Sequence, residues 1–334
     1  MEKDLVNILT PAYNSENYIS RLLDSILRQT YSKIEMFVID DGSTDSTKEI
    51  VHEYIYKFLE KGYKLHYIYQ QNSGQSYAIN KGLKLLNGEF LVWPDSDDWY
   101  ATTNAIKELV TALKNTDDSV GIVRCKYAHI DEITMKPIRY TKIIQKDNPG
   151  NVFNDVIYNR HHFSIEPGGY MIKLKFIDKF IPGREIYAEK DAGQNTQILY
   201  PYLFYSDCLS IDKVLFNYLI RKTSHSRNFY QGYNNKILRL DATERTYIKA
   251  LQSIRQDNNP VIQNAILFSK ENILHRKIAL SVFYNQNKYI RELYNTIKKE
   301  YGKKHLTTNE KILYLLSYIP LGIIFYKLLQ HIRR

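Results

Sequence analysis

Three carboxylates follow a short apolar run in the segment Phe90–Trp99. The run Phe90–Trp93 is typical of a buried strand, and Asp95-Ser96-Asp97-Asp98 follows where it ends. In an extended backbone Asp95 and Asp97 share one face, where they repel each other unless a cation lies between them. Such hard oxygen ligands suit Mg²⁺ or Mn²⁺, which usually take further ligands from substrate phosphates. The alternative is an acidic helix cap followed by a solvated turn, because Asp favours both.

Strand and helix patterns alternate through the first hundred residues and would position these carboxylates. Strands are expected at Leu5–Pro11, which Pro11 ends, at Ile34–Ile39, at Leu65–Tyr69 and in the run before Asp95, with helical segments between them. This alternation predicts an α/β fold with a Rossmann-like, mostly parallel sheet. The polar clusters after each strand should then share one rim, where a nucleotide would bind.

Composition and missing motifs exclude several classes of protein. Hydrophobic residues make up 44% of the 334 residues and charged residues 25%, as in globular proteins. No Gly-x-Gly-x-x-Gly follows the first expected strand and no Gly-Lys-Ser/Thr loop exists, which argues against dinucleotide oxidoreductases and P-loop nucleotide hydrolases. The net charge is +10, and basic residues accumulate in the C-terminal third of the chain, which ends in Arg333-Arg334. This distribution favours a basic tail on a neutral catalytic domain. No nucleic-acid partner is expected.

Four polar blocks stand in a fixed order along the first hundred residues. They are Thr10–Asn14, Val38–Asp45, Asn72–Gly74 with Asn80–Gly82, and Asp95–Asp98. This set resembles the family 2 inverting glycosyltransferases with the A-type glycosyltransferase fold, including bacterial capsular and exopolysaccharide enzymes, over roughly residues 4–225. The resemblance implies a metal-dependent enzyme, using Mn²⁺ or Mg²⁺, that moves a sugar from a UDP-sugar or other nucleotide-sugar donor onto an acceptor hydroxyl.

The resemblance also implies a role for each residue of the donor site. Pro11, Tyr13 and Glu16 would line a nucleobase pocket, and Asp40 or Asp41 would accept a hydrogen bond from the base imide. Gly74 and Asn80 would approach the ribose and diphosphate, and Ser96 would also belong to the donor-binding residues. Asp95 would contact the ribose or the metal, and Asp97 would bind the metal directly. Two alternatives remain open. The Asp40-Asp41 block can be a simple turn and helix cap, and Gly74 can be only a turn glycine.

A general base is the other requirement of an inverting transfer, because the acceptor hydroxyl must lose its proton during attack. The family supplies it from an acidic pair at a helix start in this region. If Gln194-Asn195 occupies that position, the pair is amidated and cannot act as a base, so Asp191 becomes the leading candidate and Glu189 the next. The alternative is that Asp191 merely caps a helix running to Leu199.

The chain changes character after its last expected strand. The segment Arg221–Arg227 resembles a loop that closes over the diphosphate, where His225 is either a further metal ligand or a structural histidine. We expect a catalytic domain at 1–230 and a helical region at 231–334, with a membrane-surface helix at 312–334 because an apolar stretch there is flanked by cations. A buried terminal helix or a contact between subunits of a homo-oligomer is the alternative.

These features predict a cytoplasmic enzyme at the inner face of the cell membrane. Its acceptor would be a glycan or a lipid-linked saccharide in bacterial surface polysaccharide assembly. A non-catalytic sugar- or lipid-binding module is the main rival, because Gln194-Asn195 lacks a carboxylate. A sugar nucleotidyltransferase would need a Gly-rich basic loop after the first strand, and Tyr13–Glu16 provides none.

Overall fold

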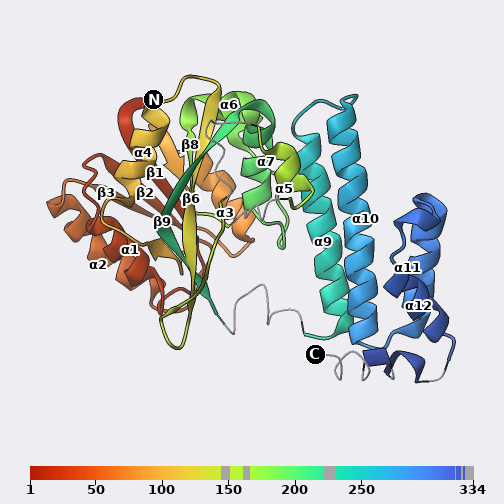
Figure 1. Cartoon of the computed structure of the whole chain (residues 1–334). Coiled ribbons are helices and arrows are strands. Elements are labelled where there is room, and N and C mark those ends of the chain that lie inside the picture. The colour runs from red at the N-terminus through yellow and green to blue at the C-terminus, as the bar shows by residue number, and fades with distance from the viewer. Residues whose placement is uncertain (144–150, 161–165, 222–230, 320, 325, 328–334) are drawn as a thin grey trace. The chain divides into compact units, whose positions relative to one another are not determined.

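A computed structural model describes residues 1–143, 151–160, 166–221, 231–319, 321–324 and 326–327. The chain divides into two compact units, which are considered separately (Figure 1). The first unit comprises residues 1–224 and 249–257, and the second comprises residues 225–248 and 258–334. The predicted site residues up to Arg221 all belong to the first unit.

The first unit alternates strands and helices as predicted. Its elements are β1 (Glu2–Ala12), α1 (Ile19–Leu27), β2 (Ile34–Asp40), α2 (Thr47–Glu60), β3 (Lys64–Tyr69), α3 (Gln75–Leu83), β4 (Gly88–Val92), β5 (Trp99–Tyr100), α4 (Ala105–Lys114), β6 (Val120–Asp131), β7 (Pro137–Tyr140), α5 (Phe153–Ile157), β8 (Tyr170–Lys173), η1 (Leu174–Phe176), α6 (Ile177–Phe180), η2 (Pro182–Arg184), α7 (Asn195–Tyr205) and β9 (Asp207–Ile220). The predicted α/β class is confirmed.

The strands form a mixed sheet in the order β3-β2-β1-β4-β8-β6-β9-β5, with β7 paired to β6. The four strands β3, β2, β1 and β4 run parallel, so their carboxyl ends meet at one edge. On the other side β8 runs antiparallel to both β4 and β6, and β5 runs antiparallel to β9. The parallel half therefore carries the nucleotide-binding arrangement, and the mixed half adds a second wall.

Hydrophobic side chains on both faces of the sheet explain its burial. Ile8 on one face of β1 belongs to the core cluster that also includes the buried faces of α1, α2 and α4. On the other face, Gly82 of α3 lies so close to Leu9 that an added Cβ would stand 2.1 Å from the Leu9 side chain. Helices thus cover both sides of the parallel strands, as parallel sheets require (Figure 1).

The prediction that Pro11 ends the first strand is wrong, because β1 continues to Ala12. The pairing of β1 with β4 stops at Ile8–Val92, so Pro11 has a neighbouring strand only on the β2 side. A missing backbone N–H is tolerated at a position that has strand pairing on one side only. The strand therefore carries Ala12 to the same rim as Asp40.

The second unit is helical, as predicted for the C-terminal region. Its elements are α9 (Tyr233–Gln252, whose last turn belongs to the first unit), α10 (Pro260–Phe283), α11 (Asn287–Glu300), η3 (Lys303–His305) and α12 (Thr308–Leu316). A capping box joins Thr307 and Glu310 at the start of α12. Glu310 also bonds His275 of α10, 2.5 Å away, which ties α12 to α10 and raises the pKa of His275.

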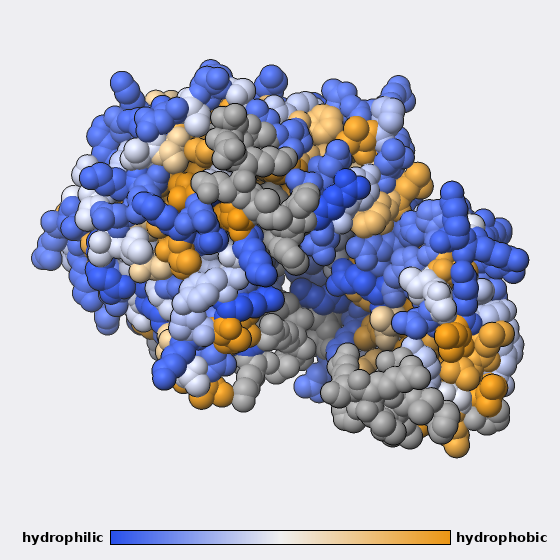
Figure 2. Space-filling model, in the orientation of Figure 1, coloured by the Kyte–Doolittle hydropathy of each residue, from blue (hydrophilic) through white to orange (hydrophobic). Residues whose placement is uncertain are grey.

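The expected membrane-surface segment is only partly helical in the described residues. The helix α12 ends at Leu316. Leu315, Ile319 and Leu321 are 65%, 53% and 70% exposed, and hydrophobic residues gather on the surface of this unit (Figure 2). No helix in the part of the chain that the structure describes has the length and hydrophobicity needed to cross a membrane.

Candidate functional site

The loops after β1 and β2 are joined into one platform at the carboxyl edge of the sheet. The Ser15 amide donates to Thr47 Oγ1 at 2.7 Å, and the Glu16 amide donates to Asp45 Oδ2 at 3.0 Å. In return, Glu16 Oε2 accepts a hydrogen bond from the Ser46 amide at 3.0 Å. Each loop thus supplies the other with partners for backbone groups that would otherwise be unsatisfied at the start of α2.

The three residues predicted for the nucleobase pocket have different surroundings. Pro11 is buried, whereas Tyr13 is 48% exposed and offers a ring at the rim. The Glu16 carboxylate is already engaged by the platform. Tyr13 is therefore the residue of this group whose side chain is most open to a stacked base.

Asp40 and Asp41 are both buried at the end of β2. Asp40 accepts hydrogen bonds from the Ser43 amide at 2.8 Å and from the Tyr67 hydroxyl at 2.6 Å. Because each carboxylate oxygen has two lone pairs, these contacts leave room for a further donor such as a base imide. The predicted role in base recognition remains a prediction.

Asp41 organises the loop that leads into α3. Its carboxylate accepts hydrogen bonds from Gln70 Nε2 at 2.8 Å and from the Ser73 and Gly74 amides at 2.9 and 2.8 Å. These charge-assisted bonds fix the start of α3, whose first side chain, Gln75, reaches into the carboxylate cluster.

Gly74 allows two chain segments to approach closely. Its φ is +112°, and a Cβ built on it would lie 2.8 Å from the Lys190 carbonyl oxygen. The neighbouring Ser76 hydroxyl donates to the Glu189 carbonyl at 3.0 Å. Gly74 is thus needed both for its positive φ and for close packing against Lys190. This packing brings residues 189–191, which include the candidate bases, to the start of α3.

We expect Gly74→Ala to destabilise the fold and to weaken donor binding. The backbone strain costs about 1–3 kcal/mol, and the clash with Lys190 adds to it. Gly62→Ala is the matched control, because Gly62 has a φ of +80° with nothing within 4 Å of its added Cβ. Thermal unfolding should show a larger loss for Gly74→Ala, and isothermal titration with UDP should show weaker binding for that variant alone. Equal losses of stability and unchanged UDP binding would contradict this role.

Asp95 lies at the centre of the carboxylate cluster. Its Oδ1 accepts hydrogen bonds from Gln75 Nε2 at 2.8 Å and from Gln194 Nε2 at 3.1 Å. Burial, followed by repulsion from Asp97, raises the pKa of Asp95 to about 7. Ser96 points to the platform, where its hydroxyl lies 2.7 Å from that of Ser15. The predicted metal or ribose contact is therefore linked to the loop after β1 and to α3 and α7.

Asp97 forms an ion pair with Arg221, the residue that directly follows β9. Its Oδ2 lies 2.7 Å from Arg221 Nε, and the two side chains are only 16% and 21% exposed. Burial raises the pKa of Asp97, and the Arg221 charge opposes that rise. The Arg221 guanidinium also stacks on the Tyr18 ring, 4.6 Å from its centroid.

Asp98 is fully buried beneath the other two carboxylates. Its Oδ1 accepts a hydrogen bond from the Leu219 amide at 2.8 Å, which ties the segment to β9. Its Oδ2 has no hydrogen-bond partner among the described residues. Burial and repulsion from Asp97 and Asp95 raise the pKa of Asp98 well above its ordinary value.

The cluster has the ligand chemistry of a divalent cation site. Buried carboxylate oxygens that repel one another gain stability from a cation, and oxygen ligands suit Mg²⁺ or Mn²⁺. Within the described residues no three His, Cys, Asp or Glu side chains form a ready metal cluster, so Asp95 and Asp97 would need ligands from elsewhere, such as substrate phosphates. His225, the predicted further ligand, lies outside the described residues.

The candidate bases stand on the segment that packs against α3. The Glu189 carboxylate accepts a hydrogen bond from the Tyr187 hydroxyl at 2.9 Å. The helix α7 begins at Asn195 and runs to Tyr205, so the alternative that Asp191 caps a helix running to Leu199 is wrong. Asp191 instead precedes the helix, in a turn where the Ala192 amide bonds the Glu189 carbonyl. Its role as the base remains a prediction.

Asn80 occupies a different place from the one its motif suggested. Both ends of its amide bond the backbone of Ile186, at 2.8 Å each, and the residue is buried. Asn80 thereby anchors the stretch that leads to Glu189. These contacts do not support the predicted approach of Asn80 to the ribose and diphosphate, which stays a prediction.

Four residues of the cluster were not among the predicted site residues: Gln75, Asp98, Gln194 and Arg221. Asp98 adjoins the Asp95 motif, and Arg221 opens the basic loop, so a signal was present for both. Gln75 and Gln194 are amides without a distinctive local pattern. Only the fold shows that both donate to Asp95.

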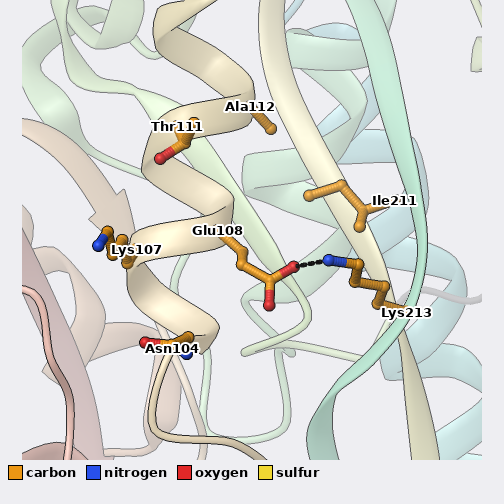
Figure 3. Close-up of a pocket in the computed structure, with 7 residues that line it drawn as sticks. All are labelled: Asn104, Lys107, Glu108, Thr111, Ala112, Ile211 and Lys213. Atoms are coloured by element: carbon orange, nitrogen blue, oxygen red, sulfur yellow. Dashed lines mark hydrogen bonds and ion pairs between the residues drawn. The ribbon is translucent and has the colours of Figure 1, made fainter.

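A surface hollow between α4 and β9 lies apart from this cluster (Figure 3). Its lining residues are Asn104, Lys107, Glu108, Thr111, Ala112, Ile211 and Lys213. Glu108 Oε2 and Lys213 Nζ form an ion pair of 2.6 Å there. No carboxylate of residues 95–98 lines this hollow, so we do not place the donor site in it.

Comparison with known proteins agrees with this geometry. Residues 7–167 match the model of glycosyl transferase family 2. This matched segment, just under half of the chain, is similar to the family 2 glycosyltransferases. An uncharacterized glycosyltransferase of Rickettsia typhi is 39% identical over 128 residues, which is 38% of each chain. Glycosyltransferase GlyA of Streptococcus pneumoniae is 45% identical over 96 residues, which is 29% of this chain and 13% of GlyA. The matches thus span well under half the length of these relatives.

Solved structures extend the likeness to the fold of nearly the whole chain. TarS residues 1–349 of S. aureus, in complex with UDP-GlcNAc, has a TM-score of 0.57 at 18% identity and covers 90% of this chain and 92% of that one. A mannosyltransferase of Pyrobaculum calidifontis, in complex with GDP-Man and Mn²⁺, has a TM-score of 0.53 at 16% identity and covers 97% and 86%. This likeness assigns the A-type glycosyltransferase fold to the chain.

Proposed function

We propose that this protein is an inverting, metal-dependent glycosyltransferase. It moves a sugar from a nucleotide-diphosphate donor, UDP-linked by preference, onto an acceptor hydroxyl. The observation that carries this proposal is the convergence of the loops after β1, β2 and β4 on one rim that contains Asp95 and Asp97. The family 2 match supports the reaction class.

Donor binding uses the platform and the end of β2. The Tyr13 ring stacks on the base, while the remaining lone pairs of Asp40 or Asp41 accept from its imide N–H. A carboxylate that accepts from an N–H favours uracil or thymine over adenine. The complexes of the structural neighbours with UDP-GlcNAc and with GDP-Man support a nucleotide-sugar at this edge of the fold.

Asp97 and Asp95 are the residues that would hold Mn²⁺ or Mg²⁺, with His225 as a further ligand. The ion, when bound, neutralises charge that develops on the leaving diphosphate. Gln75 and Gln194 hold Asp95 in place by their hydrogen bonds to Oδ1. Because these amides carry no charge, they orient the carboxylate without neutralising it.

Asp191 serves as the general base, and Glu189 is the second candidate. The acceptor oxygen attacks the anomeric carbon from the side opposite the diphosphate, and its proton passes to the Asp191 carboxylate. The bond from the anomeric carbon to the diphosphate oxygen breaks, and its electron pair stays on that oxygen. The close approach of Gly74 to Lys190, the chain neighbour of both Glu189 and Asp191, supports this assignment.

The acceptor is a glycan or a saccharide carried on a membrane lipid, as in surface polysaccharide assembly. The exposed apolar residues of the C-terminal unit and the basic residues near the end of the chain support a peripheral contact with the inner face of a membrane. On this proposal, residues 1–230 form the catalytic domain and residues 231–334 serve membrane or subunit contact.

A UDP-release assay on a panel of UDP-sugars tests the proposal. With Mn²⁺ the intact chain should release UDP from at least one donor, and a chelator should abolish the release. Thermal shift with the same donors measures binding independently, because a ligand that binds the folded state raises its melting temperature. Binding without turnover on any acceptor would favour the rival, a sugar-binding module with a degenerate site. Neither binding nor turnover would refute a nucleotide-sugar function.

A further inference from the structure

The end of β9 is fixed against the carboxylate cluster by two backbone contacts. The Leu219 amide donates to Asp98 Oδ1 at 2.8 Å, and the Ile220 carbonyl accepts from the Glu132 amide at 3.3 Å. These bonds fix the backbone on the N-terminal side of Arg221. The side chain is held as well, because its guanidinium stacks on Tyr18.

Tyr18 is anchored in turn. Its hydroxyl donates to Glu132 Oε1 at 2.9 Å. Arg221 therefore rests on a fixed ring and reaches Asp97 Oδ2 from a preset position. An Arg that is held in this way loses little side-chain entropy when it forms an ion pair.

We propose that Arg221 is the built-in counter-charge of Asp97 and that it competes with the divalent cation for this carboxylate. The inference rests on the proposed function, since it assigns the cation to Asp97. Both charges of the pair are largely buried, and removal of one partner from such a pair leaves the other uncompensated. Arg221 thus compensates the charge of Asp97 when no metal is bound, and the Arg221 charge lowers the affinity of the site for metal in the absence of donor.

The Arg221 guanidinium also binds the donor diphosphate in this proposal. A nucleotide diphosphate at the rim brings negative charge beside Arg221, and guanidinium groups bind phosphate through paired hydrogen bonds. Donor binding therefore draws Arg221 away from Asp97 and favours metal uptake. Loss of the Arg221 charge should then have opposite effects on the two affinities: the metal should bind more tightly and the diphosphate more weakly.

The test compares Mn²⁺ and UDP affinities of the full chain, measured by electron paramagnetic resonance and by titration calorimetry. Without nucleotide, Arg221→Gln should bind Mn²⁺ about tenfold more tightly than the wild type, because an uncompensated carboxylate attracts the ion. Without metal, the same variant should bind UDP about tenfold more weakly, whereas uridine should bind unchanged, because only the diphosphate meets the guanidinium.

Two further variants separate charge from folding. Arg221→Lys keeps the charge and should stay near wild-type values for Mn²⁺. Lys213→Gln removes a cation that pairs with Glu108 at 2.6 Å in the hollow apart from the cluster, and it leaves the Asp97 pair intact, so its Mn²⁺ affinity should change little. A structural role for Arg221 would weaken both ligands together, and that result would overturn the inference. Absence of Mn²⁺ binding by both the wild type and Arg221→Gln would also overturn it, while UDP binding would still decide the donor assignment.

Discussion

Replacing Asp97 with alanine is expected to lower kcat/KM for sugar transfer by about 10³-fold, the scale of losing one group that stabilises charge in the transition state. The reason is that Asp97 is the carboxylate best placed to hold a divalent cation near the leaving diphosphate. Its removal also leaves Arg221 without its partner at 2.7 Å. The measurement is the rate of UDP release with Mn²⁺ over a range of donor concentrations, which gives kcat/KM, together with Mn²⁺ affinity.

Asp178→Ala is the matched control for this prediction. Asp178 forms a similar ion pair, with Oδ1 2.8 Å from Arg184 Nε, on an exposed part of the same unit. Its loss should leave transfer within about twofold, because exposed ion pairs contribute only about 0–1 kcal/mol. Full activity of Asp97→Ala in the presence of a chelator would refute the metal-dependent mechanism.

Replacing Asp191 with asparagine is expected to lower kcat by about 10²–10⁴-fold, the usual contribution of a general base. The amide keeps the shape of the side chain and cannot take the acceptor proton. Donor binding should be unchanged, since the substitution leaves the donor platform intact. Single-turnover transfer and UDP titration together separate the chemical step from binding.

Two further amide substitutions make this test selective. Glu189→Gln addresses the second candidate, whose carboxylate already accepts a hydrogen bond from the Tyr187 hydroxyl. Glu185→Gln is the control, because Glu185 is exposed on the same segment and forms a surface ion pair with Lys84. A large loss for Glu189→Gln with little effect of Asp191→Asn would reassign the base. Normal transfer by both variants would show that the base lies elsewhere.

The parallel half of the sheet could be predicted from sequence because its signals are local. Hydrophobic periods of the strands and helices alternate, and each strand is followed directly by its polar loop. The position of Asp95 and Asp97 at the end of β4 follows from the same local pattern. Even the error at Pro11 is informative, because whether a proline fits a strand depends on which neighbours pair with it.

The contacts among the site residues could not be predicted, because their partners are far apart along the chain. Gln194 and Asp95 are separated by 99 residues, and Asn80 and Ile186 by 106. No local pattern distinguishes an amide that orients a carboxylate from one in a solvated turn. Long-range pairing also explains why α7 begins at Asn195: its start is set by the packing of Gln194 on Asp95 as much as by capping propensity.

The hydrogen bond from Leu219 to Asp98 spans 121 residues and has a bearing on how the protein matures. The family match ends at residue 167. The strand β9, whose Leu219 amide bonds Asp98, ends about fifty residues later in the chain. During synthesis, the nascent amino-terminal half can form its parallel strands before the segment 95–98 can make its hydrogen bond with Leu219. A chain truncated at residue 167 would therefore lack part of the candidate site, and the emergence of β9 from the ribosome sets the earliest moment at which this site can form.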